Sequence, residues 1–148
     1  MVKKPDIKRR KNLRLAMCAL FLLQIVICTM PFYQTLNDKG QLITQSPFGM
    51  IIIFFSVVTE IGSNMISPTI LSLLLILIPT AGFFICALDK ERNLKNIVSI
   101  ILCLAAVFII LMFPKETVSL GAMIAMILYI IISFLTSMAM VLRLSNEE

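Results

Sequence analysis

Few side chains in this sequence could do chemistry within an apolar setting, and Glu60 is the acid with the most unusual position. It follows the strongly apolar stretch 49–58 and precedes a short polar stretch, 62–64. A carboxylate at such a place could bind a cation or carry a proton, because ionisable groups at membrane depth are costly and usually functional. A solvated polar helix face is the commoner explanation, and we favour it for Glu60.

Gln24 is the only strongly polar side chain inside the apolar run 13–33. Within a bilayer its amide needs a partner on a neighbouring helix, because lipid offers none. We therefore expect Gln24 to join helices rather than to bind a ligand.

Tyr129 and Ser133 belong to a second polar feature, a stripe of small and weakly polar residues in the run 119–142. Gly121 and Ala125 begin the stripe at four-residue steps, and Ser137 ends it. Such stripes are more typical of close helix packing than of a conduction path.

Two helix-modifying residues, Pro79 and Gly82, lie in the run 67–88. Proline cannot donate a backbone hydrogen bond and crowds the carbonyl four residues earlier, so a kink is expected at Pro79. Small residues near one face predict that this helix packs closely against the next one and runs antiparallel to it. They are Ser72, Gly82 and Cys86 on the first helix and Ser99, Cys103 and Ala106 on the second.

Metal and cofactor sites are not expected. The four cysteines lie singly inside apolar runs, and the chain contains no histidine. We predict no disulfide framework, no zinc or copper site and no cofactor. The apolar runs also lack the charged groups that proton-coupled transport, voltage sensing or intramembrane hydrolysis requires, so we do not expect an enzyme. The cysteines are Cys18, Cys28, Cys86 and Cys103.

The elements that must position these residues are long apolar runs. Of the 148 residues, 59% are hydrophobic and 14% are charged, whereas soluble domains are about a quarter charged. Each run is about 20 residues long, the length that a helix needs to cross ~30 Å of hydrocarbon. We predict an all-α membrane protein, a bundle of four transmembrane helices at 13–33, 67–88, 97–114 and 119–142.

The longest connection, 34–66, is expected outside the cell. Residues 37–40 read Asn-Asp-Lys-Gly between two short β-prone segments, which predicts a hairpin. A polar face recurs at three- and four-residue steps from Phe54 onward, which favours an amphipathic helix over about 48–66 at the outer interface. A re-entrant segment, or an extension of the helix 67–88, remains the alternative.

Positive charge orients the chain. Seven of the 13 Lys and Arg residues lie in the tail 1–12 and the first turn after it. With four crossings, 11 of the 13 lie on the same side of the membrane, in the N-terminal segment, the loop 89–96 and the end 143–148. Only Lys39 and Lys115 lie on the other side. This asymmetry predicts a multi-pass cell-membrane protein with both termini cytoplasmic and 115–118 as an outer turn. A fifth crossing would move the loop 89–96 outside, so we disfavour it. Topology also explains the +5 net charge better than nucleic-acid binding does.

The stretch 72–102, SLLLILIPTAGFFICALDKERNLKNIVSIIL, carries a family resemblance. Together with the segments PFYQ and GQLITQSPFG, which are expected in the outer loop, it resembles small four-span membrane proteins common in low-GC Gram-positive bacteria. The resemblance implies four helices and no particular activity. Claudins and tetraspanins also have four spans, but they depend on loop cysteines, and this chain has none in its expected loops. Small multidrug transporters use a glutamate in their first helix, where this chain has Gln24.

These features predict a non-enzymatic protein that acts through helix or partner contacts, as an accessory, sensor or immunity subunit. The alternative is an oligomeric pore or transporter for a small or apolar solute. The expected partners are the lipid bilayer and either another membrane protein or copies of the chain.

Overall fold

The computed structural model describes residues 4–36, 40–56, 66–88, 93–113 and 118–144. These residues form five helices and one antiparallel hairpin. The elements are α1 (Lys4–Ile27), β1 (Tyr33–Leu36), β2 (Leu42–Gln45), α2 (Pro47–Ser56), α3 (Ile66–Ala87), α4 (Asn93–Leu111) and α5 (Leu120–Leu144).

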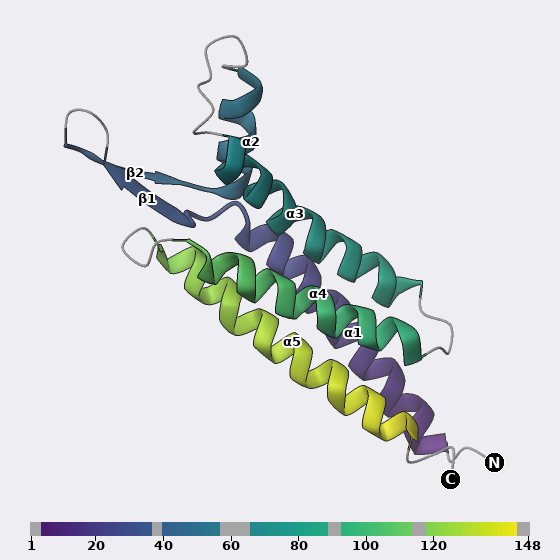
Figure 1. Ribbon diagram of the computed structural model, residues 1–148. Coiled ribbons are helices and arrows are strands. Elements are labelled where there is room, and N and C mark those ends of the chain that lie inside the picture. The colour runs from purple at the N-terminus through teal and green to yellow at the C-terminus, as the bar shows by residue number, and fades with distance from the viewer. Residues whose placement is uncertain (1–3, 37–39, 57–65, 89–92, 114–117, 145–148) are drawn as a thin grey trace.

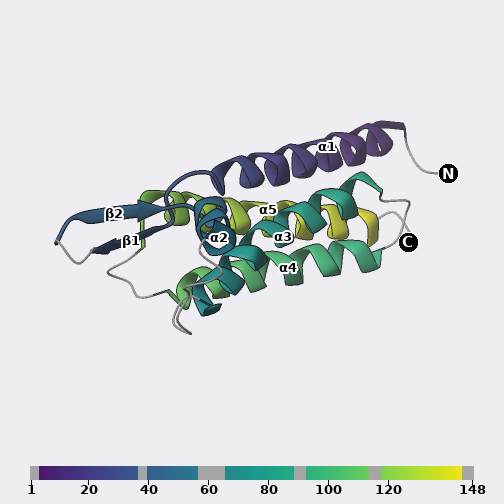
Figure 2. The ribbon, with the colours of Figure 1, turned by 90° about the horizontal axis from the view of Figure 1, so that it is seen from above.

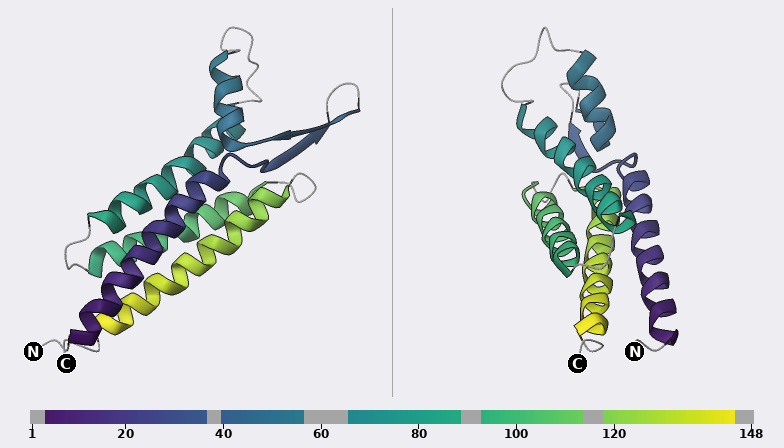
Figure 3. Two further views of the ribbon diagram at one scale, coloured as in Figure 1. Left: turned by 180° about the vertical axis from the view of Figure 1, so that it is seen from behind. Right: turned by 90° about the vertical axis from the view of Figure 1, so that its right-hand side faces the viewer.

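The four long helices form a bundle in which each packs against two neighbours. The order around the bundle is α1, α3, α4, α5, and α5 closes it by packing against α1. Successive long helices run in opposite directions, so both termini lie at one end, and the hairpin and α2 lie at the other (Figures 1 and 3). Figure 2 shows α1 on one side of the bundle and α4 on the other.

Helix α1 differs from the expected range 13–33 at both ends. It begins at Lys4, so the described part of the basic tail is helical, and Pro5 occupies the early helical position that proline favours. It ends at Ile27 because Pro31 disfavours a helical conformation for the residue before it. The expectation that 28–33 is helical was wrong, and Tyr33 begins β1 instead.

The later helices lie close to their expected ranges. Helix α3 is shifted by one residue, α4 begins four residues early and ends at Leu111, and α5 covers 120–144. Backbone bonds from 122 and 123 to the Ser119 carbonyl form the first turn of α5. Residues 114–117 lie outside the described part of the chain.

The predicted hairpin is confirmed. Tyr33 pairs with Gln45 and Leu36 with Leu42, and Gly40 has a φ of 71°, a left-handed conformation that glycine adopts without strain. A further contact joins this hairpin to the segment just before α5, because Tyr33 forms a bridge with Val118.

Only part of the predicted helix between the first two long helices lies within the described residues, and that part is helical. Helix α2 begins at Pro47, where Ser46 Oγ accepts a hydrogen bond of 3.0 Å from the Gly49 amide as an N-cap. Residues 57–65 lie outside the described part, so most of the expected polar face falls there. The described helix is almost wholly apolar and projects from the end of the bundle (Figure 1).

The outward faces of the bundle are apolar. Two segments, Thr69–Ala87 in α3 and Leu120–Leu142 in α5, are long and apolar enough to cross a membrane. In α4 the apolar part is the shorter segment Lys95–Leu111, and in α1 six Lys and Arg residues, the last of them Arg14, precede the apolar part. The side chains on these outward faces include Leu77, Phe84, Phe108, Ile127 and Phe134, each more than half exposed.

Candidate functional site: polar contacts in the bundle core

Polar side chains gather in the bundle interior, although the exterior is apolar. Each of them is at most 7% exposed, and they occur from one end of the bundle to the other. Because a buried polar group is costly without a partner, a polar contact between two elements fixes how they meet. These residues are Gln24, Tyr33, Ser72, Ser99, Ser119, Tyr129 and Thr136.

At mid-bundle, Gln24 joins α1 to α5. Its Nε2 donates to the Ala125 carbonyl at 3.2 Å, and Tyr129, one turn further along α5, faces the same amide. Neither Gln24 Oε1 nor Tyr129 Oη has a hydrogen-bond partner among the described residues. They are an acceptor and a donor, so a small rotation would allow them to pair. The sequence-based expectation that Gln24 meets a neighbouring helix agrees with this geometry.

One turn further along the chain, Cys28 contacts the backbone carbonyl of α3 whose helical hydrogen bond Pro79 removes. Proline at position 79 leaves the Leu75 carbonyl without its usual helical donor. The Cys28 thiol donates to that carbonyl at 3.5 Å. Helix α3 is continuous through Pro79, which is itself buried. No sequence signal set Cys28 apart from the other cysteines, which also lie singly inside apolar runs.

At the hairpin end, Tyr33 joins β1 to α3. Its hydroxyl lies 2.9 Å from Ser72 Oγ, and its ring centroid lies 4.5 Å from that of Phe113. Burial raises the pKa of the Tyr33 phenol to about 12, and the hydrogen bond with Ser72 acts in the opposite direction. The neutral phenol therefore links the hairpin to the bundle over the ordinary pH range.

The backbone just before α5 is hydrogen-bonded to the hairpin end of the bundle. The Ser119 amide donates to the Phe32 carbonyl at 2.9 Å, and the Phe32 amide donates to the Gln45 carbonyl at 2.9 Å. The Gln34 side chain also reaches Ser119 Oγ at 3.4 Å. Three segments that are distant in the sequence are thereby hydrogen-bonded together.

At the end of the bundle that carries the two termini, sulfur-containing side chains contact one another and a threonine hydroxyl. Thr136 Oγ1 lies 2.7 Å from the Ile132 carbonyl, to which it donates, and 3.3 Å from Met17 Sδ. The Cys18 thiol on α1 lies against that of Cys86 on α3. All four cysteines are free thiols.

Gly82 has a different role from the one that the sequence suggested. A Cβ at this position would come within 3.0 Å of three ring atoms of Phe21, which is fully buried. The glycine therefore lets α3 approach α1, rather than α4 as its small-residue pattern suggested. Phe21 itself carried no sequence signal beyond its apolar character.

The stripe on α5 leaves the interior as it proceeds. Ala125 and Tyr129 are fully buried, Ser133 is partly buried beside Cys103, and Ser137 is exposed. A four-residue step rotates about 40° beyond one full turn, so the stripe drifts around the helix. Glu60, the remaining candidate, lies outside the described residues.

The described site contains hydrogen-bond donors and acceptors but no cluster suited to a metal. No three His, Cys, Asp or Glu side chains gather in the described part of the chain. No family model, curated protein or solved structure matches this chain. The arrangement itself is suited to holding helices in register around a neutral core.

Proposed function

We propose that this chain is an integral membrane protein whose four long helices cross the bilayer, with both termini in the cytoplasm. The supporting observation is the distribution of side chains: polar groups pair inside the bundle, and large apolar groups such as Phe108, Ile127 and Phe134 face outward. Lipid is the solvent in which this arrangement is stable, because it satisfies no polar group and accepts apolar ones.

Two other origins for long apolar helices fit less well. The core helix of a soluble protein would be mostly buried, but only 33% of the α3 segment and 22% of the α5 segment are buried. A signal sequence would lie near the N-terminus, and both segments lie later in the chain.

The other two crossings are α1 and α4. Both lie alongside the longer helices in the bundle, and both expose apolar side chains such as Val26 on α1 and Leu104 on α4. The Lys and Arg distribution then puts the termini inside and the hairpin outside. Reporter fusions after residues 40, 91 and 116 test this topology, since only the first and last should report an outside location.

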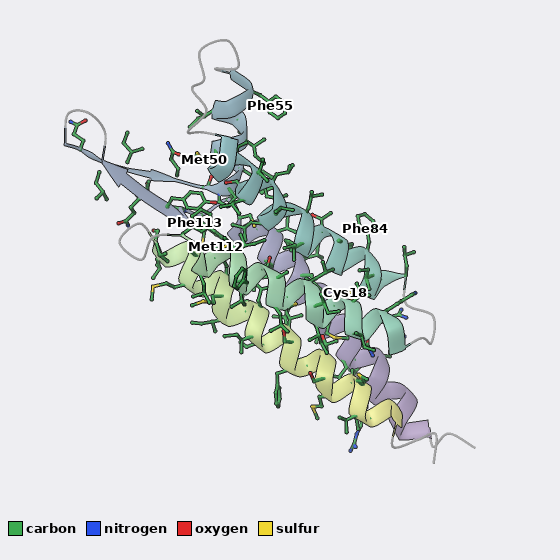
Figure 4. The ribbon with its side chains drawn as sticks, in the orientation of Figure 1. Cys18, Met50, Phe55, Phe84, Met112 and Phe113 are labelled. Atoms are coloured by element: carbon green, nitrogen blue, oxygen red, sulfur yellow. The ribbon has the colours of Figure 1, made fainter. Side chains whose placement is uncertain are left out.

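We further propose that the protein acts by binding other membrane proteins or copies of itself. Support comes from α2, where Ile52 is 67% exposed and Phe55 is 72% exposed beyond the end of the bundle (Figure 4). On the hairpin, Leu42 is 61% exposed. Apolar surface near the outer headgroup level is suited to a partner or to the interface itself.

Site-specific crosslinking distinguishes a protein partner from lipid. A photo-reactive amino acid at Ile52 should form a protein adduct in native membranes, whereas the same group at Phe108 should not. These positions are matched in exposure, at 67% and 65%, but Phe108 lies on the outward face of the bundle, in the last turn of α4. A solitary monomer in mild detergent, with no adduct at either position, would argue against this function.

A pore or transporter for a small solute is the second candidate. The observation that favours it is the pair of buried atoms, Gln24 Oε1 and Tyr129 Oη, that lack partners in the described structure. A small polar solute could bind both. Flux into liposomes that falls in Tyr129→Phe and in Glu60→Gln would support it, and the absence of flux would remove it.

A further inference from the structure

A groove of about 400 Å³ lies between the first part of α1 and the last part of α5. On α1 its lining residues follow the three- and four-residue steps of a single helix face. Two residues one turn apart on α5 form the opposite wall. The lining consists of Arg9, Asn12, Leu13, Ala16, Met138 and Leu142.

The α1 wall changes character along its length. Arg9 and Asn12 lie towards the terminus, whereas Leu13 and Ala16 lie further into the bundle. Arg9 is exposed and forms no hydrogen bond or ion pair with another described residue. The short side chain of Ala16 leaves space that a larger residue would occupy. The groove is therefore cationic and polar at one end and apolar at the other. This combination fits a ligand with an anionic head and an apolar chain.

We propose that this groove binds an anionic phospholipid of the inner leaflet. Its phosphate contacts Arg9 and Asn12, and part of one acyl chain lies along Ala16 and Met138. Arginine matches phosphate geometry with two parallel hydrogen bonds, and the surrounding basic tail adds attraction at longer range. The volume is within the usual range for small-ligand sites, about 300–1,000 Å³. The inference rests on the proposed membrane topology, which places this groove at the inner headgroup level.

Lipid retention by the full-length protein in detergent tests the proposal. Native mass spectrometry would compare bound phosphatidylglycerol with bound phosphatidylcholine in the wild type, Arg9→Gln and Lys11→Gln. Lys11 is the matched control, because it is exposed on the same helix but does not line the groove. Ala16→Leu tests the apolar part, and circular dichroism checks that each variant is folded.

We expect the wild type to retain phosphatidylglycerol about fivefold over phosphatidylcholine, the ratio that one surface cation contributes. Arg9→Gln should abolish this preference, Lys11→Gln should keep it, and Ala16→Leu should lower retention of both lipids. Equal retention of the two lipids by the wild type, or equal losses in the two charge variants, would overturn the inference.

Two further outcomes separate the alternatives. Displacement of the lipid by equimolar sn-glycerol 3-phosphate would indicate a site for free anions and would also overturn the inference. Release of the protein from membranes by alkaline carbonate would overturn the proposed membrane function itself. A protein that stays in the membrane and shows no lipid preference would refute only the groove. If Ala16→Leu does not fold, the Arg9 and Lys11 variants decide the matter alone.

Discussion

The Cys28 thiol lies 3.5 Å from the Leu75 carbonyl and donates to it, and Leu75 is the residue whose helical hydrogen bond Pro79 prevents. A donor directly after the last residue of α1 thus replaces one missing from α3. In a bilayer this replacement matters, because neither water nor lipid would satisfy the carbonyl. The last turn of α1 is thereby held at one level on α3.

A double-mutant cycle tests that relationship. Cys28→Ala should lower the free energy of unfolding by about 0.5–1.5 kcal/mol, because the carbonyl loses its donor. In a Pro79→Ala background the cost should be smaller, since the restored amide at 79 reaches the same carbonyl. Unfolding in detergent, followed by circular dichroism, gives both values. Equal costs in the two backgrounds would contradict the assignment, and Cys28→Ser should retain most of the stability.

The mid-bundle contact predicts a second coupling. Gln24→Leu should destabilise the bundle by about 0.6 kcal/mol and at most about 1.7 kcal/mol, the average and maximum for hydrogen bonds between membrane helices, because the bond to the Ala125 carbonyl is lost. Tyr129→Phe should cost less, because its hydroxyl has no partner among the described residues. If the hydroxyl pairs with Gln24 Oε1 after a small rotation, the double variant should cost less than the sum of the two. Additive costs in the same unfolding assay would show that the two side chains do not interact.

Close packing at Gly82 predicts a steric effect. Gly82→Ala should destabilise the protein by about 1–3 kcal/mol, because the new Cβ overlaps the buried Phe21 ring. Phe21→Leu in the same chain should recover part of the loss by vacating the position of the ring. Thermal melts of the single and double variants provide the measurement, and a neutral Gly82→Ala would show that α1 and α3 are further apart.

Tyr33 predicts an alkaline transition. Burial raises the pKa of its phenol from 10.0 to about 12, so the folded protein holds the proton more tightly than the unfolded chain does. The stability that this neutral phenol contributes is complete below pH 10 and is lost as the pH rises through 12. The chain has two tyrosines and no tryptophan, so Tyr129→Phe isolates the signal. The tyrosinate absorbance of Tyr33 in this variant should appear near pH 12 when the protein is folded and near pH 10 when it is unfolded. A folded midpoint near 10 would refute the burial of Tyr33.

Sequence patterns predicted the local elements well. The lengths of the apolar runs predicted all four long helices, and the Asn-Asp-Lys-Gly segment predicted the hairpin. Both predictions succeeded because these elements depend on residues that are close together in the sequence. Helix ends were less accurate. Helix α1 stops at Ile27 although apolar residues continue to Tyr33, since Pro31 and the strand pairing of Tyr33 outweigh hydropathy.

Contacts between helices were harder to predict. Gln24 could be expected to find a partner on another helix, but nothing in the sequence specified the Ala125 carbonyl. The role of Cys28 depends on which residue of α3 lies opposite, and Gly82 faces Phe21 because α1 rather than α4 occupies that side. Such pairings depend on helix rotation and order, which a single sequence without aligned relatives does not contain.

The hydrogen-bonded closure at the hairpin end also has a consequence for how the protein is made. Gln34 and Ser119 are 85 residues apart, so the hairpin emerges from the ribosome long before its partner segment does. Until α5 begins, the Phe32 carbonyl and the outer edge of β1 lack the bonds that Ser119 and Val118 supply. The end of the bundle that carries the hairpin can therefore close only after α5 has been made, so this closure is a late step of assembly.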